Sequence, residues 1–230
     1  MEIEILQLLE GAKKAEGLTV IIDVFRAFST ACYAVENGAS KIYPVGNIEM
    51  AYFLKERNPE FILMGERFER KPEGFDFGNS PFLLPETGLG GKTIVHTTSS
   101  GTQGIANAVN ADEMITGSFV NAGAIIDYIK KQQPEKVSLV CMGYSCEYPT
   151  DEDTFLAEYI RDRLLGKTTN FPEMVERLRT GSGARFFAPE NQEWSPEEDF
   201  WLCLALNRFP FILKVETDEH GLNYLRKIEP

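Results

Sequence analysis

The chain has 230 residues, a formal net charge of −12 and a hydrophobic fraction of 43%. This length fits one large domain or two small ones, and the hydrophobic fraction is too high for a disordered chain. The acidic balance excludes a general basic surface for nucleic acid, and no apolar run is long enough to cross a membrane.

The first residues and the cysteines indicate where the protein works. Residues 1–5 alternate like a strand and lack the basic start of a signal peptide. The four cysteines are scattered, mostly within apolar stretches, which is typical of buried free thiols: they are Cys32, Cys141, Cys146 and Cys203. Free thiols favour a cytoplasmic protein.

Apolar runs typical of strands alternate with helical patterns along the chain. The predicted strands are residues 2–8, 18–23, 41–45, 60–64, 93–97, 113–116, 136–142 and 210–215. The predicted helices are residues 28–37, 47–57, 101–109, 119–132, 152–165 and 195–206, with Asn47 and Ser195 as N-caps. This order predicts an α/β fold, a layered sheet (mostly parallel or mixed) with helices on both faces.

The domain organisation is predicted to be a single α/β domain over residues 1–230. After residue 166 the chain becomes less strand-like, so residues 167–230 could form a C-terminal cover subdomain. The apolar segment 209–213 could be core or interface, which leaves a homodimer open.

The first candidate site segment runs from Asp23 to Thr30, directly after the predicted strand 18–23. In open α/β sheets, ligands bind outside the carboxyl ends of strands. A carboxylate such as Asp23 can hold a divalent cation there, and Arg26 can bind an anion. Ser29 and Thr30 add donors at the start of the next helix. A surface ion pair beside an ordinary helix start is the alternative.

The second segment, Glu66-Arg67, places another acid and base after the predicted strand 60–64. It leads into a long irregular loop that contains Asn79 and Ser80, and loops of this length are usually functional. Alternatively, Glu66 and Arg67 pair with each other beside a solvated loop.

The third segment follows the predicted strand 93–97 and crowds hydroxyls and a glycine into a strand-to-helix turn. Its residues are Thr98, Ser99, Ser100, Gly101 and Thr102. Such a turn can present amides and hydroxyls to an anion, but it lacks the Gly-Lys-Ser/Thr ending of a nucleotide-binding P-loop. A simple capping cluster is the alternative.

An acidic run at 151–153 begins the predicted helix 152–165. The helix dipole accounts for most of this run. One of its acids, Asp153, could still reach a metal held mainly by Asp23 and Glu66. Magnesium usually keeps several waters, so two or three carboxylates suffice.

Taken together, these segments resemble the 2-phosphosulfolactate phosphatase family over nearly the whole chain. The resemblance rests on the motifs Asp23-x-x-Arg26-Ala27-x-Ser29-Thr30, Gly65-Glu66-Arg67, Gly74-x-Asp76-x-x-Asn79-Ser80-Pro81, Thr98-Ser99-Ser100-Gly101-Thr102, the acidic helix start around Glu152-Asp153, and Asp199-Phe200-Trp201-Leu202-Cys203. It implies a cytoplasmic, magnesium-dependent hydrolase with an α/β fold that converts 2-phospho-3-sulfolactate to 3-sulfolactate and phosphate.

The chain departs from the family pattern in two places. The family loop commonly reads Thr-Thr-Asn-Gly-Thr, whereas Ser99 and Ser100 stand at its second and third places. Phe28 follows Arg26-Ala27, where a small hydroxyl residue is frequent. The shorter donor at Ser100 bears on the substrate more than on the chemistry.

The resulting hypothesis is a phosphatase for a small anionic phosphoester, with Mg²⁺ on Asp23, Glu66 and Asp153. Asp23, Arg26 and Glu66 are the expected catalytic residues. The expected substrate-binding residues are Ser29, Thr30, Arg67, Asn79, Ser80, Thr98, Ser99, Ser100, Gly101 and Thr102. Because Phe25 stands where haloacid-dehalogenase enzymes carry a second acid, we favour Asp23 as a metal ligand over a nucleophile.

Three other functions remain open at this point. One is a non-catalytic anion-binding or regulatory module that kept the pocket. Another is a serine hydrolase using Ser99 or Ser100, although the two histidines, His96 and His220, come with no Gly-x-Ser-x-Gly elbow. The third, a protein–protein scaffold, lacks an amphipathic or exposed apolar stripe.

Overall fold

The computed structural model describes all 230 residues. The strands are β1 (Glu2–Gln7), β2 (Gly17–Ile22), β3 (Lys41–Pro44), β4 (Ile62–Gly65), β5 (Thr93–Thr97), β6 (Ala111–Gly117), β7 (Lys136–Cys141), β8 (Ile212–Thr217) and β9 (Asn223–Ile228). The α-helices are α1 (Leu8–Lys14), α2 (Ala27–Glu36), α3 (Ile48–Arg57), α4 (Gly101–Asn107), α5 (Ala122–Gln132), α6 (Asp151–Leu164), α7 (Phe171–Thr180) and α8 (Glu197–Cys203). Three short 3₁₀ helices complete the chain: η1 (Phe119–Asn121), η2 (Ala184–Phe187) and η3 (Pro189–Asn191).

All nine strands form one mixed sheet in the order β1-β7-β2-β6-β8-β9-β3-β5-β4. The first four strands in this order pair in parallel, and so do the last three. The antiparallel hairpin β8–β9 joins the two groups, pairing with β6 on one side and with β3 on the other. This architecture confirms the predicted α/β class.

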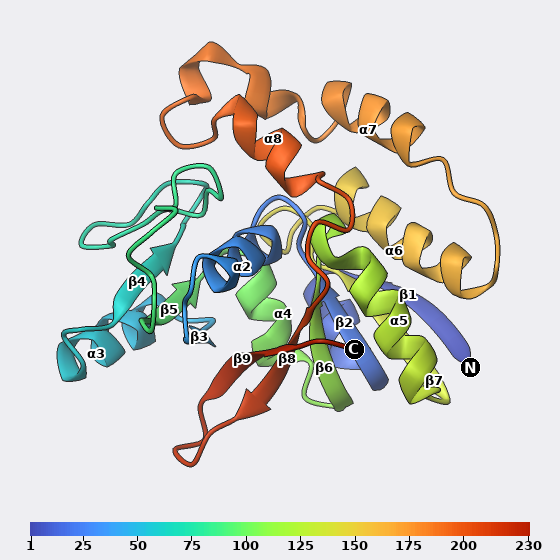
Figure 1. Cartoon of the computed structure of the whole chain (residues 1–230), viewed down its shortest axis with the longest axis horizontal. Coiled ribbons are helices and arrows are strands. Elements are labelled where there is room, and N and C mark those ends of the chain that lie inside the picture. Colours follow the sequence, from blue (N-terminus) through green and yellow to red (C-terminus); the bar gives the residue numbers. More distant parts are fainter.

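The hairpin also determines where the strand ends lie. Three successive antiparallel pairings, β6–β8, β8–β9 and β9–β3, separate the two parallel groups. Neighbouring strands twist by roughly 20–25°, and by more in two-stranded ribbons. The sheet therefore turns so far that β2 and β4 direct their carboxyl ends toward the same central region (Figure 1).

Apolar residues alternate between the two faces of β2 and pack against a layer of helices on each side. Leu18, Val20 and Ile22 belong to the core beneath α5 and α6. Ile21 belongs to the opposite core, which includes residues of α1, α2 and α4. Helices thus cover both faces of the sheet, as the sequence predicts.

The C-terminal third contributes both a cover and part of the sheet. The segment that contains α7, η2 and α8 arches above the end of β2 in Figure 1. After it, Phe209, Phe211 and Leu213 are buried in the core. The apolar segment 209–213, left open as core or interface, therefore lies mainly in the core.

Some local predictions are confirmed and others are wrong. Asn47 caps α3 by accepting a hydrogen bond from the Met50 amide at 3.1 Å. Ser195 does not cap α8, because the N-cap position is Pro196 and the Ser195 hydroxyl has no partner. Helices α1 and α7 and strand β9 were not predicted. All four cysteines are free, as expected.

No helix of this fold combines the length and the apolar character that crossing a membrane requires.

Candidate active site

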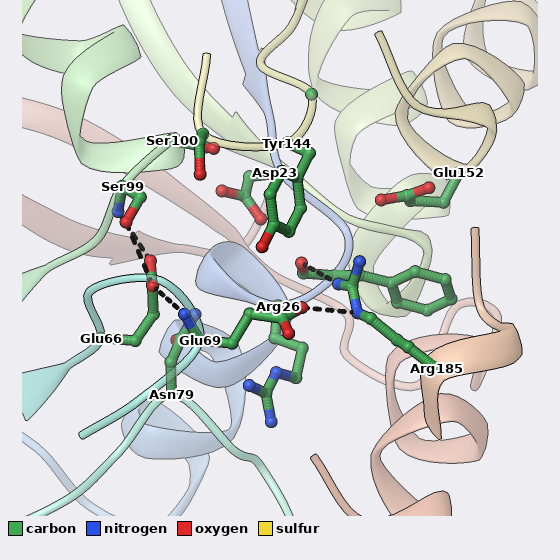
Figure 2. Close-up of a pocket in the computed structure, with 13 residues that line it drawn as sticks. Asp23, Arg26, Glu66, Glu69, Asn79, Ser99, Ser100, Tyr144, Glu152 and Arg185 are labelled. Atoms are coloured by element: carbon green, nitrogen blue, oxygen red, sulfur yellow. Dashed lines mark hydrogen bonds and ion pairs between the residues drawn. The ribbon is translucent and has the colours of Figure 1, made fainter. Parts of the chain in front are cut away.

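The segments that follow β2, β4 and β5 meet at one polar pocket (Figure 2). The loop after β7, the start of α6 and the 3₁₀ helix η2 complete its walls. The pocket is lined by Asp23, Phe25, Arg26, Glu66, Glu69, Asn79, Ser99, Ser100, Gly143, Tyr144, Ser145, Glu152 and Arg185. The converging strand ends therefore place residues from six separate parts of the chain around one space.

Asp23 is held in a fixed orientation by two backbone amides. One carboxylate oxygen accepts a hydrogen bond from the Ala27 amide at 3.0 Å, and the other accepts one from the Gly101 amide at 2.7 Å. A Cβ at position 101 would lie 2.9 Å from Asp23 Oδ2, so only glycine allows this approach. Burial raises the pKa of Asp23 to about 7, and the Glu66 and Glu152 carboxylates act in the same direction.

Glu66 is held in a similar way, at the end of β4. Gly65 precedes it with φ +145°, and a Cβ there would come 1.9 Å from the Thr97 carbonyl oxygen. Glu66 Oε1 accepts from the Ser99 amide at 2.6 Å, while Oε2 accepts from the Glu69 amide at 2.8 Å and the Ser99 hydroxyl at 3.1 Å. Glycine is thus required for the turn that presents this carboxylate.

These bonds change the interpretation of the hydroxyl-rich turn. The Ser99 and Gly101 amides, expected to cradle an anion, donate to Glu66 and Asp23 instead. The side chains of Thr98 and Thr102 bond within the turn itself, since the Thr98 amide donates to Thr102 Oγ1 at 2.9 Å. The main role of the turn is therefore to orient two carboxylates.

In the acidic run that begins α6, the pocket residue is Glu152 and not the expected Asp153. The two Asp153 oxygens accept from the Val24 and Gly143 amides, each at 2.9 Å, so this side chain joins two loops. Glu152 lines the pocket, and its Oε2 atom has no hydrogen-bond partner. Burial raises the pKa of the Glu152 carboxyl, and nearby Arg185 opposes that effect.

The two arginines expected to bind substrate are engaged elsewhere. Arg26 lines the pocket, but its Nη1 atom donates to Asp199 Oδ2 and to the Trp194 carbonyl, both at 2.7 Å. Arg67 donates to Thr97 Oγ1 at 2.7 Å and lines a separate groove beside α3. Arg67 therefore does not reach the pocket.

Of four other expected substrate-binding residues, three lie outside the pocket and one lines it. Ser29 donates to the Val24 carbonyl oxygen at 2.7 Å, and Ser80 donates to Asp199 at 2.8 Å. The Thr30 hydroxyl is buried without a partner, and none of these three residues lines the pocket. Asn79 does line it, with its Oδ1 atom 3.3 Å from a His96 ring nitrogen.

A serine-hydrolase arrangement is not assembled here. His96 is fully buried and faces Asn79, and burial lowers the pKa of its imidazole to about 3. The Ser99 hydroxyl donates to Glu66 and not to a histidine. His220 lies in an exposed turn. The pocket therefore contains no histidine base for either serine.

The pocket suits a hydrated divalent cation better than a fully protein-bound one. No three His, Cys, Asp or Glu side chains are grouped closely enough to form a ready-made metal cage. Mg²⁺ is usually bound by one or two carboxylates and keeps several waters. Asp23, Glu66 and Glu152 are all at least nine-tenths buried beside one another's charge, and a bound cation would offset that repulsion.

Sequence reasoning missed Glu69, Tyr144 and Arg185 as pocket residues. Tyr144 follows β7, so the rule about the carboxyl ends of strands could have found it. Glu69 lies three residues beyond Glu66 in the same loop. Arg185 lies in the segment after residue 166, where no local pattern distinguishes it from a surface arginine.

Comparison with known proteins gives one consistent family. The family model described as 2-phosphosulpholactate phosphatase matches residues 3–218. A protein of Thermotoga petrophila, named probable 2-phosphosulfolactate phosphatase, is 43% identical over 145 residues, which cover 63% of this chain. This match spans only 61% of that relative's own length.

Two relatives with the same name match over longer regions. The protein of Caldanaerobacter subterraneus is 31% identical over 216 residues, covering 86% of this chain and 87% of the relative. The protein of Bacillus subtilis is 30% identical over 204 residues, covering 87% of this chain and 88% of the relative. The likeness therefore includes the cover segment as well as the sheet.

Proposed function

The chain belongs to the 2-phosphosulfolactate phosphatase family, and we propose that it is a phosphoric monoester hydrolase acting on 2-phospho-3-sulfolactate with Mg²⁺. The products would be 3-sulfolactate and phosphate. One observation carries the proposal: Asp23, Glu66 and Glu152 line one buried pocket, with two of the three fixed by backbone amides. The names of the relatives support the substrate.

The charge of the pocket supports the need for a cation. Four carboxylates line it, and of its two arginines Arg26 is already paired with Asp199. A substrate with phosphate, sulfonate and carboxylate groups would be repelled by this arrangement in the absence of bound positive charge. Phosphoryl transfer depends mainly on positioning and on neutralising charge.

We propose Asp23 and Glu66 as the ligands of Mg²⁺, with Glu152 in place of Asp153 as the third carboxylate. Mg²⁺ held there would supply a Lewis acid for a phosphoryl oxygen or would make a bound water more acidic. The amides of Ala27, Ser99 and Gly101 keep the carboxylates oriented. Because they are set before substrate arrives, little reorganisation is needed during the reaction.

The remaining pocket residues have proposed roles in binding. The Ser100 and Tyr144 side chains line the same space and offer hydroxyl donors to substrate oxygens. Phe25 packs against Phe186 and Phe200, with ring centroids 4.9 and 5.8 Å away, so the position two residues after Asp23 supplies an aromatic ring and not the second acid of a phosphoaspartate motif. This favours a ligand role for Asp23. Beryllofluoride bonded to Asp23 in a crystal would instead identify a nucleophile.

The test is phosphate release from 2-phospho-3-sulfolactate and a panel of small acidic phosphoesters. We expect turnover with Mg²⁺, its loss in EDTA and its return when Mg²⁺ is restored. Glu66→Gln should lower kcat by about 100-fold or more, since the variant removes charge at the site of phosphoryl transfer. Exposed Glu198→Ala is the matched control. Absence of turnover on the whole panel would refute the proposal, and turnover that persists in EDTA would refute its metal part.

A further inference from the structure

Arg185 is the cation of the pocket with the fewest fixed contacts: it pairs with Glu69 and acts on the nearby Glu152 carboxylate, and only one of its guanidinium nitrogens forms a hydrogen bond. Arg26 is 3% exposed and in contact with Asp199, which has no exposed surface. Arg67 lies outside the pocket. Arg185 reaches the pocket from η2, opposite Ser99 and Glu66, as Figure 2 shows.

The contacts of Arg185 hold its guanidinium in place and leave part of it free. Nη2 donates to the Phe25 carbonyl oxygen at 3.1 Å. Nε lies 2.9 Å from Glu69 Oε1, but the angle is too poor for a hydrogen bond, and both side chains are about one-fifth exposed. The rings of Phe25 and Phe186 flank the group at 5.9 and 5.0 Å. Nη1 therefore remains available to a ligand.

We propose that Arg185 binds the sulfonate of the substrate, an anionic group that is not cleaved, and so selects substrates that carry one. This inference rests on the proposed function, which places the phosphate beside Asp23 and Glu66. A guanidinium presents several donors in one plane and matches the oxygens of such groups. An entering anion would replace Glu69 as the partner of Nε, while the bond to Phe25 would be kept.

The location of Arg185 gives selection a physical basis. Arg185 lies in η2 of the cover segment, whereas Asp23 and Glu66, the carboxylates proposed to lie beside the phosphate, directly follow strands β2 and β4 of the sheet. A ligand with two anionic groups would contact both parts, and a simple phosphate would contact one. Arg185 would thus affect discrimination between ligands more than the binding of inorganic phosphate.

Calorimetric titration of the full chain in Mg²⁺ tests this without relying on turnover. The probes are 3-sulfolactate, lactate and inorganic phosphate, and the variants are Arg185→Met and Arg185→Lys. Arg179→Met is the control, because Arg179 packs over Phe187 outside the pocket. Thermal unfolding of each variant checks that it is folded.

We expect the wild type to bind 3-sulfolactate at least about 10-fold more tightly than lactate. Arg185→Met should weaken 3-sulfolactate binding about 10- to 100-fold, the range expected for hydrogen bonds to a charged group, while phosphate binding changes by less than about 3-fold. Arg185→Lys should fall between. Equal weakening of both ligands, or no wild-type preference for 3-sulfolactate over lactate, would overturn the inference. If the wild type prefers 3-sulfolactate over lactate but has no phosphatase activity, only the proposed function would be refuted.

Discussion

Asp23 illustrates how the site sets the protonation of a single residue. In an unfolded chain its carboxyl titrates near 3.8, but in the folded, metal-free protein burial raises its pKa to about 7. Between these values the folded state binds a proton that the unfolded state has lost. The Asp23 contribution to stability is therefore present at low pH and is lost as pH rises toward and through 7.

Asp23→Asn should remove this pH dependence. In EDTA, the unfolding free energy of the variant minus that of the wild type should increase by about 2–3 kcal/mol from pH 5 to pH 8, at 1.36 kcal/mol per pKa unit. Chemical denaturation at several pH values measures the difference. The lowered pKa of His96 makes the unfolding free energy rise with pH, but this effect is the same in the variant and the wild type. A difference that stays constant with pH would contradict the assignment.

The neighbouring acids Glu152 and Asp153 at the start of α6 are expected to have different roles, the first in metal binding and the second in stability. Asp153→Ala removes the acceptors of the Val24 and Gly143 amides and should cost roughly 2–6 kcal/mol of stability, at 1–3 kcal/mol for each buried amide. Glu152→Gln leaves those bonds intact.

Glu152→Gln should therefore keep or raise the melting temperature of the metal-free protein while weakening Mg²⁺ binding. Thermal unfolding with and without Mg²⁺ measures both effects. If Glu152→Gln destabilised the metal-free protein as much as Asp153→Ala does, the two residues would have the same structural role.

At the scale of elements, the turn between β5 and α4 determines where Asp23 lies. Gly101 approaches that carboxylate so closely that an added Cβ would lie 2.9 Å from both Asp23 Oδ2 and the Ala27 Cβ atom. Contacts this short must be relieved by a shift of the turn or of the carboxylate.

Gly101→Ala is thus expected to lower kcat by about 100-fold, because a displacement of about 1 Å at a catalytic group can have that effect. Steady-state kinetics measures it, and Gly90→Ala is the control, because Gly90 shares the absence of a positive φ with Gly101 and nothing lies within 4 Å of the added Cβ. Normal kinetics in the Gly101 variant would show that the close approach is not needed.

Helices and strands with a clear local sequence pattern could be predicted, whereas the distant residues that individual side chains contact could not. The strand and helix runs through residue 165 correspond closely to β1–β7 and α2–α6. Ser195 had the local pattern of a cap, but the helix begins beyond Pro196. Arg26 looked like an anion ligand because its partner, Asp199, is 173 residues away.

At the scale of the whole molecule, the pocket depends on pairings that no local pattern reveals. The insertion of β8–β9 between β6 and β3 turns the sheet, and the cover segment delivers Arg185 and Asp199. Asp199 accepts from Arg26, Ser80 and the Phe82 amide, so it joins three walls at one point. The sequence could therefore predict the sheet side of the site but not the cover side.

The central claim is that the pocket lined by the carboxylates following β2 and β4 and by Glu152 of α6 binds one hydrated divalent cation. A crystal soaked with Mn²⁺ and 3-sulfolactate tests this most directly, because the anomalous signal locates the metal. We predict a peak in the pocket within coordination distance of Asp23 or Glu66, and none on Asp153. A pocket without a peak, or a metal bound elsewhere while the pocket holds only the organic anion, would contradict the account.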